Sequence, residues 1–369
     1  MDFPQSPEPN TQPLRILEIG SLGSSGLFVD AVPAQTQFYW TGAKRRDRDQ
    51  YSFGPLRMLR SLAKLRRREF DLLVVHTTQY PPWHPRSILT ALRDWHYRSL
   101  RGLFGLFAWR FTHLFHSVPI AVVDLRDSCH IGRHNFFLLD SCVAFFKREL
   151  PTDNWLAFCK SSYPNFPGRK WRSFARNRRR VEKLKPISLG FYSHFEGAAA
   201  PVKSADIFFA GRIGSNNTAR VAGFKELQAL KAEGYVVDIA TEPLAWPEYM
   251  RRMSAAWLAW SPGGLGWDCY RHYEAPLAGT APLMNHPAIV RHRPLKDGEQ
   301  CVLYGVEAGG LTEAVRRALA DKAALHKMAK AGAEHILKHH SRFALAEYVT
   351  TTVLGRRLDG SRYERNMDS

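Results

Sequence analysis

An arginine and a glutamate stand one helical turn apart in a short, glycine-rich segment, and together they could bind a phosphorylated diol. The segment covers residues 261–285 and reads SPGGLGWDCYRHYEAPLAGTAPLMN. Residues three positions apart share a helix face, so Arg271 and Glu274 are predicted to lie side by side. A guanidinium group binds phosphate oxygens in a bidentate way, and a carboxylate can accept hydrogen bonds from both hydroxyls of a ribose. One helix face could therefore hold a nucleoside diphosphate.

The residues around this pair predict how the chain positions it. Glycines before the helix allow a positive φ and a close backbone approach; they are Gly263, Gly264 and Gly266. The first N–H groups of a helix have no partner within it and favour a diphosphate. Asp268 is expected to cap the start of the helix, Gly279 to follow its end, and Pro282 to lie where the chain is no longer helical.

The remaining face of this helix is expected to be buried. Tyr270, Tyr273 and Leu277 recur at helical spacing and are predicted to face the core. A simpler interpretation stays open, in which a buried helix lies between two strands and Arg271 and Glu274 form an exposed ion pair. A glycine-rich turn alone is a weak signal, but its occurrence together with the arginine and the glutamate favours a binding site.

The segment resembles the C-terminal half of GT-B glycosyltransferases, especially exostosin-type and cell-envelope enzymes that are similar to family 1. Their pattern is G-x-G-x-D-x-x-R-x-x-E-x-x-x-x-G-x-x-P, and the matching residues are Gly264, Gly266, Asp268, Arg271, Glu274, Gly279 and Pro282. The resemblance implies that Glu274 binds the ribose of a nucleotide sugar and that Arg271 binds its phosphates. It covers residues 206–304 strongly and the N-terminal half in outline.

One departure from the family pattern concerns stereochemistry. Retaining GT-B enzymes often have two glutamates eight positions apart, and Gly266 occupies the place of the first one here. Asp268 is nearby but out of register. The resemblance therefore does not fix the stereochemical outcome, although the missing glutamate favours inversion.

A second loop is predicted to reach the diphosphate. It reads FAGRIGSNNTAR over residues 209–220, follows a predicted strand and opens a helix. Its backbone amides, together with Arg212 or Arg220, are candidate phosphate ligands, as in the corresponding loop of the same families. An ordinary strand-to-helix turn with solvated arginines is the open alternative.

Transfer to a sugar hydroxyl needs a base on the acceptor side, because a neutral hydroxyl is a poor nucleophile. The segment VVDLRDSCHIGRH, residues 122–134, follows a predicted strand in the N-terminal half. Asp127 is the favoured catalytic residue there, with His130 and Asp124 as further candidates. Such residues also cap helices or pair with neighbouring arginines, which is the alternative for each of them. His76, at the end of another strand, is a second candidate base.

The chemistry is expected to need neither a metal nor a cofactor, with the nucleotide sugar as a co-substrate. A helix N-terminus and arginines can stabilise a diphosphate leaving group. The histidines and cysteines also lack the spacing typical of metal ligands.

Composition sets the class of protein. The 369 residues are 45% hydrophobic, enough for two cores of ordinary size, which excludes a chain that is disordered throughout. The 52 Lys and Arg against 34 Asp and Glu give a net charge of +18, so anionic partners are expected.

Five scattered cysteines argue against a disulfide framework and favour a reducing cytosol. Residues 1–13 are polar and proline-rich, unlike a signal peptide, and are expected to be disordered.

Strands alternate with helical stretches along the chain, which favours parallel sheets. In the N-terminal half the expected strands are 14–21, 71–78, 118–125 and 155–159, with a helix before the second. In the C-terminal half the expected strands are 206–210, 235–240, 256–260 and 281–284, with helices at 218–233, 248–254 and 268–278. The predicted class is α/β, with two Rossmann-like domains facing each other across a cleft.

The predicted boundaries follow from a change in composition. Residues 192–204 contain Gly197, three alanines and Pro201 and are typical of a linker. The acceptor-side domain is therefore expected over 14–197 and the nucleotide-sugar domain over 198–340. Residues 341–369 are expected to supply a helix that crosses back to the first domain, followed by a tail.

Two basic segments indicate contact with an anionic surface. Residues 98–117 are aromatic and basic, too short and charged to span a bilayer, but suited to lie in its interface. A helix packed in the first domain is the equal alternative. For residues 168–185, a solvated basic face or a membrane contact is favoured over nucleic acid, because no nucleic-acid-binding module accompanies the segment.

The resemblance implies a glycosyltransferase that moves a sugar from a nucleotide donor to an envelope glycan or lipid-linked acceptor. The enzyme is expected to be cytoplasmic, and a peripheral location on the inner face of the cytoplasmic membrane is the open alternative. A noncatalytic nucleotide-sugar or glycan-binding protein with the same fold is the main alternative, and a nucleic-acid-binding protein is a third. Steep salt dependence without competition by nucleoside diphosphates would identify the last of these.

Overall fold

The computed structural model describes residues 13–20, 26–40, 55–78, 84–85, 117–159, 171–191, 202–213, 218–240 and 242–359. The described residues form two compact units. Residues 188–341 and 127–129 make up the second unit, and the described residues before and after them make up the first. None of the described helices has an apolar stretch long enough to cross a membrane.

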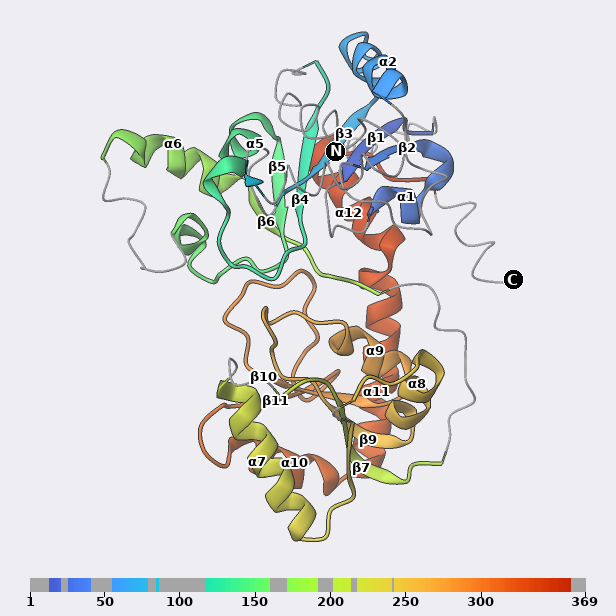
Figure 1. Ribbon diagram of the computed structural model, residues 1–369. Coiled ribbons are helices and arrows are strands. Elements are labelled where there is room, and N and C mark those ends of the chain that lie inside the picture. Colours follow the sequence, from blue (N-terminus) through green and yellow to red (C-terminus); the bar gives the residue numbers. More distant parts are fainter. Residues whose placement is uncertain are drawn as a thin grey trace, which may run out of the picture. The chain divides into compact units, whose positions relative to one another are not determined.

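The first unit is built on a parallel sheet of six strands in the order β2-β1-β3-β4-β5-β6 (Figure 1). The strands are β1 (Ile16–Gly20), β2 (Thr36–Trp40), β3 (Leu72–His76), β4 (Ile120–Asp124), β5 (Ala144–Lys147) and β6 (Leu184–Pro186). Strands β1, β3, β4 and β5 are buried along their whole length. Both faces of these strands are therefore covered, as expected for a parallel sheet.

The helices of the first unit come from both ends of the chain. They are α1 (Phe28–Ala31), α2 (Pro55–Arg66), α5 (Phe136–Ser141), α6 (Trp171–Glu182) and α12 (Arg342–Leu354), with 3-10 turns at Pro33–Gln35, Arg133–Asn135 and Asn154–Phe158. Helix α12 inserts Leu345, Ala346 and Val349 into the core, where they pack with side chains of β1, β3 and β4. The last described helix is thus part of the first unit (Figure 1).

The second unit is a separate parallel sheet of five strands in the order β11-β10-β9-β7-β8. The strands are β7 (Ala205–Ala210), β8 (Val237–Ala240), β9 (Ala256–Trp260), β10 (Ala281–Asn285) and β11 (Val302–Tyr304). The helices are α7 (Thr218–Ala232), α8 (Trp246–Ser254), α9 (Arg271–Leu277), α10 (Gly310–Leu319) and α11 (Lys322–His340). Residues on one face of the sheet pack with α7, α10 and α11, and residues on the other face pack with α8 and α9.

The structure confirms most of the predicted strands and corrects one. Residues 155–159 are not a strand but the end of a 3-10 turn, because the Asp153 carboxylate accepts a hydrogen bond from the Trp155 amide at 3.0 Å and caps the turn. Four strands of the two sheets were not predicted from the sequence; they are β2, β5, β6 and β11.

Candidate functional site

Helix α9 is shorter than the sequence predicted. It begins at Arg271, with Tyr270 as the N-cap and no side-chain capping bond, so the prediction that Asp268 caps the helix was wrong. At the other end, Gly279 has a φ of +70° and its amide bonds to the Pro276 carbonyl, while the Thr280 amide bonds to the Ala275 carbonyl. These two bonds form a Schellman motif, which confirms Gly279 as the residue that ends the helix.

Asp268 has a different task from capping. Its side chain is buried, and its two oxygens accept hydrogen bonds from the Leu189 amide at 2.8 Å and the Tyr273 hydroxyl at 2.6 Å. Tyr273 is itself buried in a core cluster, as its helical spacing predicted. Asp268 therefore anchors the turn before α9, and it positions the helix through the protein's own donors.

A close approach by α11 fixes the other side of α9. A Cβ atom on Gly332 would lie 3.1 Å from Pro276 Cβ and 3.0 Å from the Gln300 carbonyl, so this position leaves little room for a side chain. Pro276 lies inside α9, where it cannot donate a backbone hydrogen bond. The helix is consequently held by packing on both sides rather than by its own length.

Arg271 reaches from the start of α9 to the end of β7. Its Nη1 donates to the Ala210 carbonyl at 3.0 Å, and its guanidinium lies over the Phe209 ring at 5.3 Å. The Nε and Nη2 atoms are buried, and neither has a hydrogen-bond partner among the residues that the structure describes. Two nitrogen atoms of a permanent cation are thus buried without an acceptor among the described residues.

Arg220 lies close to Arg271, at the first turn of α7. Its Nη1 donates to the Arg212 carbonyl at 3.1 Å, and burial together with the charge of Arg271 lowers its pKa. A Cβ atom on Gly264 would come within 2.8 Å of Arg220 Nη2, so the glycine allows the guanidinium to lie against the backbone. The structure therefore brings Arg220, Gly264 and Arg271 together, whereas the Arg212 side chain is exposed.

The glycine-rich turn differs in its backbone from the prediction. None of Gly263, Gly264 and Gly266 has a positive φ. The turn is instead closed by hydrogen bonds, from the Gly264 amide to the Gly266 carbonyl at 2.7 Å and from the Gly263 amide to Asn285 Oδ1 at 2.8 Å. The expected close approach is present at Gly264, because the missing side chain there makes room for Arg220.

Glu274 is buried one turn after Arg271 and shares the site with a residue that sequence reasoning missed. Its Oε2 accepts a hydrogen bond from the Tyr249 hydroxyl of α8 at 2.6 Å. Burial raises the pKa of Glu274 to about 7, and the Tyr249 hydrogen bond acts in the opposite direction. A tyrosine 25 residues earlier in the chain gives no local signal that it belongs to this carboxylate.

Cys269 and Ser261 also lie beside the pair. Their side-chain Sγ and Oγ atoms are 3.2 Å apart, and His272 Nε2 is 3.1 Å from the Ser261 carbonyl oxygen. Burial opposes ionisation of Cys269, but the charges of His272 and Arg271 lower the pKa of its thiol to about 5. The cations His272 and Arg271 thus stabilise a negative charge beside the candidate site.

The proposed bases of the first half have varied surroundings. Asp127 is exposed, and His130 is partly buried, with a pKa lowered by burial and by Lys147. Asp124 is buried and bound by Arg126 and Lys147, at 2.8 Å and 3.1 Å. Burial alone would raise the pKa of Asp124, but these two cations hold it well below its usual range. Asp124 thus pairs with Arg126, which was the alternative to a catalytic role in the sequence analysis.

His76 has a similar internal partner. Its Nε2 lies 2.7 Å from Glu18 Oε1, and both side chains are buried. Glu18 also accepts hydrogen bonds from the amides of Leu27, Phe28 and Val29 at the start of α1. The pair therefore ties β3 to β1 and α1.

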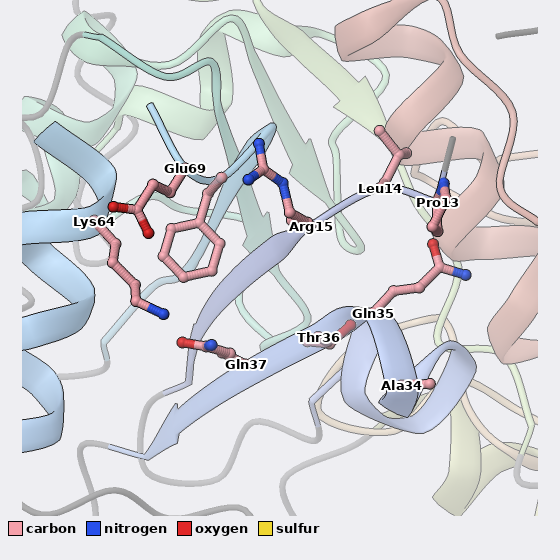
Figure 2. Close-up of a pocket in the computed structure, with 10 residues that line it drawn as sticks. Pro13, Leu14, Arg15, Ala34, Gln35, Thr36, Gln37, Lys64 and Glu69 are labelled. Atoms are coloured by element: carbon pink, nitrogen blue, oxygen red, sulfur yellow. The ribbon is translucent and has the colours of Figure 1, made fainter. Parts of the chain in front are cut away.

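No group of three or more His, Cys, Asp or Glu side chains that could hold a metal occurs in the described part of the chain. Asp47 and Asp49, whose Asp-x-Asp spacing is typical of metal-binding carboxylates, lie outside the described residues. A hollow of about 290 Å³ lies at the amino ends of β1 and β2, with Arg15, Gln37 and Lys64 around it (Figure 2). Ligands of open parallel sheets bind at the carboxyl ends, so this hollow is at the wrong edge for the candidate site.

The basic segments are described in part. Residues 98–116 lie outside the described residues, and residues 171–182 form α6. Arg176 and Arg180 of α6 bind Asp140, while Phe174 is 44% exposed and stacks on Trp155 at 5.6 Å. This helix presents a mixed basic and aromatic face.

No protein-family model matches the chain, and no curated protein matches it. Solved structures do match over nearly the whole length. HepE of Anabaena in complex with UDP is 12% identical, with a TM-score of 0.52 over 92% of this chain and 99% of that chain. The complex of HepE with UDP-glucose gives a TM-score of 0.51 at the same identity and coverage. A glycosyltransferase from Rickettsia africae is 9% identical, with a TM-score of 0.54 over 92% of this chain and 98% of that chain.

These similarities show the fold. Two parallel sheets with helices on both faces and similarity that spans both units confirm two Rossmann-like domains of the GT-B type. The function has to be argued from the site.

Proposed function

We propose that the protein is a glycosyltransferase that transfers a sugar from a nucleoside diphosphate sugar, and that Arg271, Arg220 and Glu274 bind this donor. One observation carries the proposal. Nε and Nη2 of Arg271 are buried without hydrogen-bond partners among the described residues, and burial together with the charge of Arg271 lowers the pKa of the neighbouring Arg220. Like charges in a buried site repel each other, and an anion between them removes that cost.

The division of tasks follows from the chemistry of each group. The guanidinium groups bind the two phosphates and stabilise the negative charge that develops on the leaving diphosphate. The Glu274 carboxylate accepts hydrogen bonds from the hydroxyls of the pentose, which distinguishes a ribonucleotide from other polyanions. HepE, which has the same fold, is described in complex with UDP and with UDP-glucose, and this supports a uridine nucleotide as the first donor to test.

The proposal extends to the catalytic base, the stereochemical course and the acceptor. Asp127 serves as the base that accepts the proton of an acceptor hydroxyl, with His130 as the alternative, and the transfer proceeds by inversion without a metal. The acceptor is an envelope glycan or a lipid-linked sugar. The exposed Phe174 and the arginines of α6 support a contact with an anionic membrane surface, which cosedimentation with anionic vesicles would test.

Calorimetric titration with UDP, GDP, ADP and CDP tests the donor site. We expect one of them to bind, and Arg271→Ala to weaken binding by roughly 30- to 100-fold, because two charge-assisted hydrogen bonds are lost. Arg251→Ala is the matched control, because Arg251 lies on the surface of the same unit and pairs with Glu248. Equal affinity of both variants and wild type would refute the site.

Release of nucleoside diphosphate from nucleotide sugars then tests catalysis. Turnover with an added acceptor supports a glycosyltransferase. Tight binding with no turnover for any donor and acceptor would instead indicate a noncatalytic nucleotide-sugar-binding protein of the same fold.

A further inference from the structure

Tyr249, from helix α8, hydrogen-bonds the acidic end of the candidate site. Its hydroxyl donates to Glu274 Oε2 at 2.6 Å, a short hydrogen bond to a buried carboxylate. The Glu274 side chain makes no other hydrogen bond among the described residues. The Oε1 atom and the second lone pair of Oε2 are therefore left for a ligand.

The Tyr249 ring is itself held in place. It packs edge-on against Phe208 of β7 at 5.9 Å and lies 5.5 Å from Trp246 of the same helix. Phe208 is completely buried, so this side of the ring cannot shift without disturbing the core. The packing of the ring consequently holds the hydroxyl toward Glu274.

We propose that Tyr249 is a positioning residue of the donor site, which fixes one oxygen of Glu274 so that the other oxygen can bind the pentose hydroxyls. The inference rests on the proposed function and adds a residue to it. The same hydrogen bond offsets part of the cost that burial imposes on the charged form of the carboxylate.

The groups that face Glu274 decide the direction of its titration. Burial raises its pKa to about 7, Cys269 adds to this rise, and Tyr249, Arg271 and His272 oppose it. Tyr249 comes from α8, and the other three come from α9 and the turn before it. Removing the Tyr249 hydroxyl takes away one of the groups that favour the charged form. The ionisation of Glu274 then moves to higher pH.

Donor affinity should follow this ionisation, because a protonated carboxyl has lost acceptor capacity toward the pentose hydroxyls. We expect wild-type affinity to fall as the pH is lowered through about 7. In Tyr249→Phe the midpoint should move up by roughly one pH unit, the value of one hydrogen bond to a charged group. Binding should then be roughly five- to tenfold weaker at pH 6 to 7 and nearly equal to wild type at pH 9.

The experiment is a titration with UDP, GDP, ADP and CDP from pH 5.5 to 9 for wild type, Tyr249→Phe, Glu274→Gln and Tyr235→Phe. Tyr235 packs against the core of the same unit and serves as the matched control. The terminal phosphate of the ligand also titrates, but it is common to all four proteins and cancels in the comparison. Circular dichroism and melting temperature check that each variant is folded.

The outcomes separate the two proposals. A shifted midpoint in Tyr249→Phe, with no carboxylate midpoint in Glu274→Gln and no change in Tyr235→Phe, supports the positioning role. Equal weakening of Tyr249→Phe at every pH indicates a merely structural tyrosine and overturns it, as does an unchanged profile. If wild type binds none of the four nucleotides at any pH, the proposed function itself fails.

A second measurement isolates the pentose. At pH 9, wild type and Tyr249→Phe should both prefer a ribonucleoside diphosphate over its 2′-deoxy form, and Glu274→Gln should have lost much of that preference. Equal discrimination by all three proteins would overturn the assignment of Glu274 to the pentose, and with it the role of Tyr249.

Discussion

Both sheets carry buried charges near the carboxyl ends of their strands, but the two sets of charges have different partners. In the first unit, Asp124 is bound by Arg126 and Lys147. Glu18 is bound by three backbone amides and His76. These carboxylates have a full set of donors from the protein, and they hold strands and helices together.

The second unit is arranged in the opposite way. Arg271 and Arg220 are two cations that repel each other, and Nε and Nη2 of Arg271 lack hydrogen-bond partners in the described residues. Burial works against the charge of Glu274 next to them. The comparison teaches that burial alone does not identify a functional charge. A buried charge whose donors and acceptors are satisfied supports the fold, and one that is left unsatisfied costs stability and indicates a ligand.

The largest expected effect concerns the buried carboxylates of the first unit, whose hydrogen-bond donors come from the protein. Asp124→Ala removes the carboxylate between two cations and leaves Lys147, which is fully buried, without it. We expect the free energy of unfolding to fall by about 3–5 kcal/mol, as for other buried ion pairs that lose one partner. Urea denaturation measures the loss. Glu313→Ala is the control, because Glu313 and Arg317 form an exposed ion pair, and its loss should be below about 1 kcal/mol.

Removing the buried charge of Glu274 in the second unit should raise the free energy of unfolding instead of lowering it. The pKa of Glu274 rises from 4.5 to about 7 on folding, so the folded state binds the proton more tightly, and its stability falls as the pH rises between these values. Glu274→Gln should therefore be more stable than wild type by about 3 kcal/mol at pH 8, with the gain vanishing near pH 4.5. Thermal unfolding at both pH values measures it. A loss of stability at pH 8 would contradict the comparison, and Glu248→Gln, on the exposed surface, should show no such gain.

The smallest expected effect separates two glycines of the second unit. Gly264→Ala would place a Cβ atom 2.8 Å from Arg220 Nη2, the flexible end of a side chain, so the guanidinium moves and the fold stays intact. We expect weaker nucleotide binding with stability within about 0.5 kcal/mol of wild type. Gly298→Ala, at a φ of +75°, should cost about 1 kcal/mol of stability and leave binding unchanged. Calorimetry and thermal unfolding of both variants distinguish the two effects.

The sequence was sufficient to predict the parts of the site that depend on local spacing. Arg271 and Glu274 share a helix by their separation, and Gly279 ends that helix in the predicted way. Arg220 follows from a loop between a strand and a helix, and the structure brings it to Arg271. Helical periodicity and turn residues carry this information because the interactions they report are only a few residues apart.

The rest of the site depends on contacts between distant segments. Tyr249 meets Glu274 across 25 residues, and Asp268 finds its donor in Leu189 across 79 residues, so neither role has a local pattern. Three-residue strands such as β6 and β11 are too short for a period to emerge. Residues 155–159 were predicted as a strand because they are apolar. In the structure, the hydrogen bond to the Asp153 side chain caps a 3-10 turn there instead.

The place of α12 in the core of the first unit has a consequence for the synthesis of the chain. Residues 13–187 emerge from the ribosome long before Leu345, Ala346 and Val349, which fill the space beside β1, β3 and β4. The first unit to be translated is therefore the last to complete its interior, and it waits with exposed apolar surface while the second unit folds. A premature stop before residue 342 would leave an N-terminal unit that chaperones and proteases recognise as unfinished.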